Sequence, residues 1–131
     1  MDELKEWGRR YISGRVVQPH DAVMFDIDDT LIYTNEKLNT PIIELLHDAK
    51  KQGYQIIIIT ARPSLRPVIN WTILQLRHYN IPYNYLGFTS AETKTIMKKK
   101  LPYNFVLSVG DMPTDLTDSE HYLNISNFSH N

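Results

Sequence analysis

The chain has 131 residues, of which 42% are hydrophobic and 22% charged, and its formal net charge is −1. These values are typical of one globular domain, and they exclude a disordered chain and a strongly basic nucleic-acid-binding protein. The absence of cysteine excludes disulfides, cysteine catalysis and thiolate metal sites. No apolar run approaches the length of a membrane span, and the charged start does not resemble a signal peptide. We therefore expect no membrane contact and a cytoplasmic location.

The order of apolar patterns predicts strands that alternate with helices. Short apolar runs without polar alternation predict strands buried on both faces, at 23–27, 55–60, 83–88, 104–109 and 121–125. Apolar residues at helical spacing predict helices at 1–12, 41–52, 65–79 and 91–101. This alternation is typical of an α/β fold with a three-layer, doubly wound parallel sheet. We expect a single domain over residues 1–131, and we expect Thr40 to cap the second helix.

Three aspartates follow the first predicted strand. Asp26, Asp28 and Asp29 lie within four residues, and in a continuing strand Asp26 and Asp28 would project from one face, about 6–7 Å apart along it. Ligands of parallel sheets bind beyond the carboxyl ends of the strands. A single aspartate there often only closes the strand, but three mutually repelling carboxylates favour a functional site.

The second predicted strand ends at Thr60, with Arg62 and Arg66 close behind. A hydroxyl beside free backbone N–H groups suits a phosphate oxygen, and the two arginines could contact the same anion. Each residue also has a structural alternative. Thr60 could cap its own turn, and the arginines could lie in solvent or pair with nearby acids.

A second acidic group, Asp111 and Asp115, follows the predicted strand at 104–109, after the permissive Gly110. If this strand lies beside the first, all these acids share one crevice and need a cation. Carboxylates, carbonyls and water are the ligands that Mg²⁺ prefers.

An acidic site that handles phosphate also needs an ammonium group. Lys94 is our first choice, and Lys98, one helical turn later on the same face, is the alternative. The lysine run at 98–100 is otherwise typical of a solvated helix face.

Taken together, these motifs resemble those of the haloacid dehalogenase superfamily of phosphohydrolases, over about residues 23 to 116. The matching residues are Phe25-Asp26-Ile27-Asp28-Asp29-Thr30, Thr60 at its strand end, Lys94, and Gly110-Asp111 with Asp115. Within the superfamily, the double aspartate and the stretch Thr60-Ala61-Arg62-Pro63-Ser64 are similar to the class B acid phosphatase-like branch.

The resemblance implies a Mg²⁺-dependent phosphomonoester hydrolase. Asp26 would attack phosphorus and form an aspartyl-phosphate, while Asp28 would protonate the leaving oxygen and then activate water. The expected substrate contacts are Thr60, Arg62 and Lys94. The expected metal ligands are Asp26, Asp28 through its carbonyl, Asp111 and Asp115. Asp115 would either bind the metal directly or support the residues that do.

Members of this superfamily often insert a cap domain after the first motif or between the second and third. The intervals from Asp26 to Thr60 and from Thr60 to Lys94 are equal, and each is filled by the predicted crossover elements. We therefore expect no cap. The open crevice would admit bulky substrates, or a second copy of the chain would cover it in a homo-oligomer.

Two alternatives to a phosphatase for small phosphorylated substrates stay open. The first is a nucleotide or polynucleotide-end phosphatase, like the phosphatase half of polynucleotide kinase-phosphatases, with nucleic acid contacted by lysines and arginines. The net charge gives this interpretation little support. The second is a non-catalytic binding module with the same scaffold, against which the presence of both Asp26 and Asp28 argues.

Overall fold

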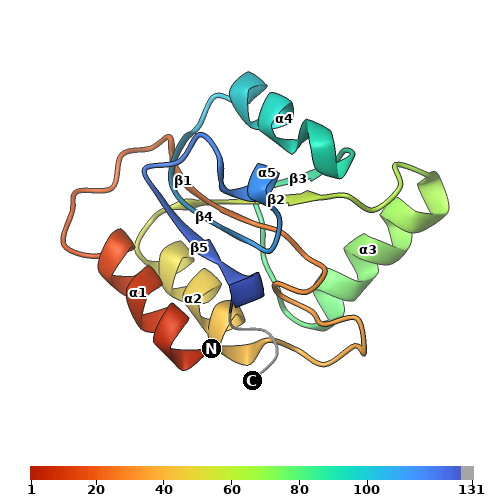
Figure 1. The fold of residues 1–131 in the computed structure, drawn as a ribbon, viewed down its shortest axis with the longest axis horizontal. Helices are drawn as coiled ribbons and strands as arrows, with labels where there is room; N and C mark the ends of the chain where they lie inside the picture. Colours follow the sequence, from red (N-terminus) through yellow and green to blue (C-terminus); the bar gives the residue numbers. More distant parts are fainter. Residues whose placement is uncertain (128–131) are drawn as a thin grey trace.

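A five-stranded parallel sheet with helices on both faces forms the centre of the computed structural model, which describes residues 1–127 (Figure 1). The strand order is β3-β2-β1-β4-β5, and every pair of neighbours is parallel. The strands are β1 (Asp21–Phe25), β2 (Gln55–Thr60), β3 (Tyr85–Phe88), β4 (Asn104–Gly110) and β5 (His121–Asn124). The predicted doubly wound α/β fold is thereby confirmed.

One helix precedes the first strand, and the others lie between strands or, for the last 3₁₀ turn, after β5. The helices are α1 (Asp2–Ile12), α2 (Thr40–Lys51), α3 (Arg66–His78), α4 (Lys94–Lys100) and α5 (Pro113–Leu116), with 3₁₀ turns η1 (Ala91–Thr93) and η2 (Ile125–Asn127). The expected N-cap Thr40 is wrong, because Asn39 precedes the helix and Thr40 is its first residue. The Asn39 side chain makes no capping bond and donates instead to the carbonyl of Thr30, at 2.8 Å.

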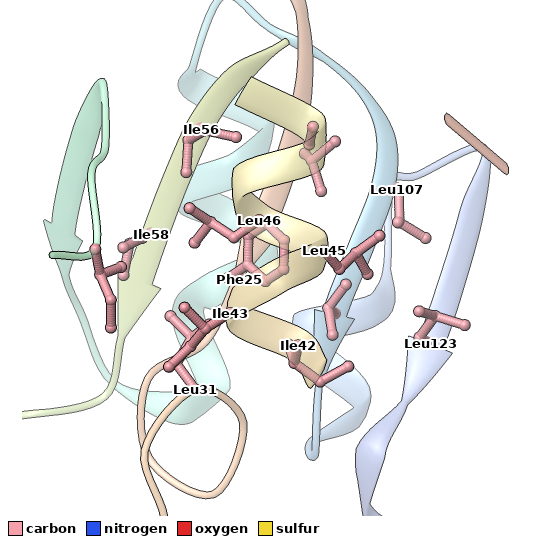
Figure 2. Close-up of a cluster of buried hydrophobic side chains, with 14 of the residues drawn as sticks. Phe25, Leu31, Ile42, Ile43, Leu45, Leu46, Ile56, Ile58, Leu107 and Leu123 are labelled. Atoms are coloured by element: carbon pink, nitrogen blue, oxygen red, sulfur yellow. The ribbon is translucent and has the colours of Figure 1, made fainter. Parts of the chain in front are cut away.

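Apolar residues on both faces of β1 explain why it lies at the middle of the sheet. Val23 and Phe25 belong to the cluster that packs under α1 and α2, with Phe25 among the side chains drawn in Figure 2. Ala22 and Met24 belong to a second cluster on the other face, to which Met97 of α4 adds. A strand that is apolar on both faces has to be covered on both.

The connections between β1, β2 and β3 contain only loops and one helix each. The chain passes from β1 to β2 through a loop and α2, and from β2 to β3 through α3. Neither connection contains a cap domain, as expected. In the part of the chain that the structure describes, no helix has the length and apolar character needed to cross a membrane.

The strand order also determines where the chemistry lies. Strand β1 is hydrogen-bonded to β2 on one side and to β4 on the other, so Phe25 is opposite both Ile58 and Val109. The carboxyl ends of β1, β2 and β4 therefore meet at one edge, where ligands of such sheets bind.

Burial of α2 against the sheet should dominate the stability of the fold. We expect Leu46→Ala, at a fully buried position of α2, to lower the free energy of unfolding by about 2–5 kcal/mol. Leu74→Ala is the matched control, because Leu74 is also helical but 58% exposed, and should change it by less than about 0.5 kcal/mol. Urea denaturation measures both. Equal effects of the two substitutions would contradict this packing.

Candidate active site

A tight turn, rather than more strand, follows Phe25. The N–H of Asp26 donates to the carbonyl of Val109 at 3.0 Å, and the Ile27 carbonyl then accepts N–H groups from the next turn. Asp29 has a φ of 60°, a left-handed conformation that aspartate tolerates better than most residues. The expected strand through Ile27 is therefore wrong at its end, because the chain bends after Phe25, and Asp26 and Asp28 have different partners.

Three of the predicted aspartates converge. Asp26 follows β1, Asp111 and Asp115 follow β4, and one carboxylate oxygen from each lies within 4.8 Å of the other two. Asp115 is fully buried and Asp26 almost so. The Oδ1 atom of Asp111 is buried without a hydrogen-bond partner among the described residues. A divalent cation is the group that such a set of oxygens suits. The side chain of Asp28 is not part of it.

Lys94 reaches this cluster from the start of α4. Its Nζ donates to Asp26 Oδ1 at 2.8 Å and to Asp115 Oδ1 at 2.7 Å, and the residue is only 1% exposed. Burial is the largest single influence on the pKa of Lys94 and lowers it, but attraction to Asp26 and Asp115 leaves that pKa above its ordinary value. Lys94 is therefore a cation held by two carboxylates.

One ammonium group does not balance three carboxylates. Burial, and after it the neighbouring charge of Asp115, raise the pKa of Asp26 well above its ordinary value, against the opposing effect of Lys94. The folded protein therefore binds a proton at Asp26 more readily than the unfolded chain does.

The other candidate lysine, Lys98, is also buried but contacts different groups. Its Nζ donates to the Ser108 hydroxyl at 2.9 Å and to the backbone carbonyl of Asp115 at 2.9 Å. Of the two lysines, only Lys94 reaches the carboxylate oxygens. The sequence alone did not indicate that Lys98 is buried, because a lysine run on a short helix is usually solvated.

Asp28 is held by Arg62. The guanidinium donates from Nε to Asp28 Oδ2 at 3.0 Å and from Nη2 to Asp28 Oδ1 at 2.9 Å. Its Nη1 donates to Thr72 Oγ1 at 3.0 Å and to Gln75 Oε1 at 2.8 Å. The centre of the Trp71 ring lies 5.1 Å from Arg62 Cζ. Thus α3 fixes Arg62, and Arg62 fixes both oxygens of Asp28.

The three α3 residues around Arg62 are a part of the site that the sequence did not indicate. Thr72 occurs in a stripe that reads as helix core, and nothing local shows that an arginine from the preceding loop folds back onto it.

Thr60 and Arg66 lie near the same edge of the sheet. Thr60 is fully buried at the end of β2, and its Oγ1 accepts the N–H of Arg62 at 3.2 Å. Both sequence interpretations of Thr60 are compatible with this contact, since the hydroxyl hydrogen is still available to donate. Arg66 is exposed on the first turn of α3.

Gly110 is required by the position of Asp115. A Cβ at Gly110 would lie 2.5 Å from Asp115 Cβ, closer than atoms can approach. The second oxygen of Asp115 accepts the N–H of Met112 at 3.0 Å, which closes the turn into α5. The spacing of Gly110 and Asp115 is thus a packing requirement of the site.

Removal of one crowded charge should stabilise the metal-free protein. In EDTA, we expect Asp26→Asn to raise the free energy of unfolding at neutral pH, because the amide oxygen can still accept from Lys94. The raised pKa of Asp26 means that wild-type stability falls as the pH rises from the ordinary carboxyl range through that pKa. The gain should therefore grow with pH, as urea denaturation at several pH values can measure. A gain that shrinks with rising pH would contradict the proposed crowding.

Comparison with known proteins identifies the family of the chain. A family model described as haloacid dehalogenase-like hydrolase matches residues 23–125, most of the chain. "Putative phosphatase YxeH" of Bacillus subtilis (strain 168) is 25% identical over 112 residues, which are 82% of this chain and 42% of that protein. The chain thus spans less than half the length of this curated relative.

Solved structures show the same fold at low identity. The class C acid phosphatase from Bacillus anthracis superposes with a TM-score of 0.68 at 16% identity, over 89% of this chain and 65% of that one. A chain of the Pnkp1/Rnl/Hen1 complex superposes with a TM-score of 0.65 at 22% identity, over 79% of this chain and 43% of that one. With the family model matched over 23–125, the chain belongs to the haloacid dehalogenase-like hydrolases.

Proposed function

We propose that this chain is a Mg²⁺-dependent phosphomonoester hydrolase that works through an aspartyl-phosphate. The observation that carries the proposal is the convergence of Asp26, Asp111 and Asp115 with Lys94 beside the ends of β1 and β4. A purely structural cluster gains nothing from three close carboxylates.

The donor set fits Mg²⁺. All three groups are carboxylates, and among the described residues they outnumber the one ammonium that contacts them, while a buried oxygen of Asp111 has no hydrogen-bond partner there. Asp26, Asp111 and Asp115 would hold the ion, with the Asp28 carbonyl as a further candidate ligand. When bound, Mg²⁺ would supply positive charge that offsets the repulsion between a carboxylate nucleophile and a phosphate dianion.

Asp26 is the nucleophile of this proposal. A carboxylate oxygen forms the bond to phosphorus while the bond from phosphorus to the leaving oxygen breaks, which gives the aspartyl-phosphate and an alcohol. Lys94 orients Asp26 through its 2.8 Å hydrogen bond and offsets negative charge that builds up on the phosphoryl oxygens. The Thr60 hydroxyl would donate to one of those oxygens.

Asp28 is the acid and base. As a carboxylic acid it gives its proton to the leaving oxygen, and as a carboxylate it then takes a proton from the water that attacks phosphorus. The second step releases inorganic phosphate and restores Asp26. The role of Arg62 in this scheme is to orient Asp28, since its Nε and Nη2 both donate to that carboxylate. Direct contact of Arg62 with the phosphate is our earlier sequence prediction and the competing role.

Because no cap domain lies between its motifs, we propose that this edge of the sheet is open to the substrate. We place the chain with the capless members of the family and keep the class B acid phosphatase-like branch as its predicted position. We propose a small phosphorylated molecule as the substrate, and a nucleic acid end as the alternative that strong salt dependence of activity would favour.

The first test of this function is hydrolysis of para-nitrophenyl phosphate. We expect turnover with Mg²⁺, loss of turnover in EDTA, and a decrease in kcat of about 10³-fold or more for Asp26→Asn. Asp118→Asn is the control, because Asp118 is exposed and its left-handed φ of 54° also suits asparagine. Activity that survives Asp26→Asn would refute the nucleophile. A broad phosphoester panel without any turnover would favour the binding module.

A second test separates the two roles of Arg62. Asp28→Asn should slow formation of the aspartyl-phosphate, measured as kcat/KM, about 10²–10⁴-fold on glycerol phosphate, whose alkoxide needs a proton, and much less on para-nitrophenyl phosphate. Hydrolysis of the common intermediate should slow equally for both substrates. Arg62→Lys cannot donate to both oxygens of Asp28, so it should show the same dependence on the leaving group with little change in KM. A large rise in KM for both substrates with no dependence on the leaving group would mean that Arg62 binds phosphate instead.

A further inference from the structure

A second buried lysine lies directly behind the candidate active site. Lys98 is 2% exposed and follows Lys94 by one turn of α4. Besides Ser108, its ammonium donates to the backbone carbonyls of Asp115 (2.9 Å) and Thr117, and to the Ser119 hydroxyl at 3.1 Å. Across residues 1–127 it forms no ion pair within 4.0 Å, and its hydrogen-bond acceptors are all uncharged oxygens. The Phe105 ring centre lies 5.2 Å away, and Asp118 and Asp115 attract the ammonium only from a longer distance.

Burying an ammonium group lowers the free energy of unfolding, so its hydrogen bonds have to contribute something in return. Burial is the largest cause that lowers the pKa of Lys98, to about 8, and a methionine would fill the same space without that cost. What methionine could not provide is a set of donors for two backbone carbonyls.

Those two carbonyls belong to the segment that carries Asp115. Helix α5 has only four residues, which is too short to be stable by its own hydrogen bonds. Lys94 holds the carboxylate of Asp115 and Lys98 holds its backbone carbonyl, so one helix grips both ends of the same residue.

We propose that Lys98 is a positioning residue that fixes Asp115 for divalent cation binding. This inference rests on the proposed function, in which Asp115 helps to hold Mg²⁺. The Lys98 ammonium forms no hydrogen bond with the carboxylate oxygens, and it acts on Asp115 through the backbone of residues 115–117. Its loss lets the Asp115 carboxylate move away from Asp26 and Asp111, so the metal binds more weakly, while Asp26, Asp28 and Lys94 keep their chemistry.

The experiment is a titration of the full-length chain with Mn²⁺ as the probe for the Mg²⁺ site, with free Mn²⁺ followed by electron paramagnetic resonance. Lys98→Met should raise the Kd for Mn²⁺ by about tenfold or more. Lys99→Met and Lys100→Met are the controls, since both lysines are exposed on the same helix, and should leave Kd unchanged. A lower melting temperature with an unchanged Kd would overturn the inference and leave Lys98 a purely structural role.

A milder variant covers the case in which Lys98→Met does not fold. Ser119→Ala keeps the lysine but removes one acceptor of its ammonium, together with the hydrogen bonds of Ser119 to the Thr117 carbonyl and the Ser108 hydroxyl. It should raise the Kd for Mn²⁺ about threefold, the effect of roughly one hydrogen bond. An unchanged Kd in this variant would also count against the inference.

The readout separates this inference from the proposed function, because Mn²⁺ binding is measured without turnover. A wild-type chain that binds Mn²⁺ but hydrolyses no phosphoester refutes the hydrolase and leaves the role of Lys98 standing. A wild-type chain that hydrolyses phosphoesters, with a Lys98→Met variant that binds Mn²⁺ normally, refutes the role of Lys98 alone. A wild-type chain that binds no Mn²⁺ overturns both.

Discussion

Repulsion between carboxylates is the constraint on which the site depends. Parallel pairing of β1 with β4 brings Asp26 together with Asp111 and Asp115, and among residues 1–127 only Lys94 forms an ion pair with any of them. Repulsion within the cluster lowers the free energy of unfolding, and burial of the apolar core has to offset this loss. Continuous burial of β1 and β2 does so, because ten of their eleven residues are buried and the strand ends cannot move apart without exposing them.

Helices α3 and α4 hold the charged side chains of the site in position. α4 provides both buried lysines, and α3 provides the contacts that hold Arg62 on Asp28. Asp26 and Asp28, the proposed nucleophile and acid, therefore come from one short loop but are positioned by separate helices. This separation lets Asp26 lie in a buried, highly charged environment while the Asp28 side chain stays 48% exposed.

Local patterns were enough to predict the fold and the acidic cluster, because both depend on features that repeat along the chain. Apolar runs without alternation gave the strands, helical spacing gave the main helices, and the carboxyl-end rule then placed Asp26 near Asp111. The short α5 and the end of β1 were missed, since each depends on hydrogen bonds that form only in the folded chain. The same applies to Arg62, whose partners in α3 lie 10 and 13 residues further on.

Lys94 and Lys98 show most clearly what the sequence could not predict. Their spacing gives both the same helix face, so the sequence supported Lys94 only as a first choice and could not show which of the two reaches the carboxylates. They differ because β4 and the segment after it pass beneath α4, with the Asp115 carboxylate under its first turn and backbone carbonyls under its second. The segment that packs against α4 thus decides which lysine contacts the carboxylates of Asp26 and Asp115 and which contacts backbone carbonyls. A second lysine at this spacing marks a functional role only where the opposing segment offers buried oxygens and carries a residue that the chemistry needs.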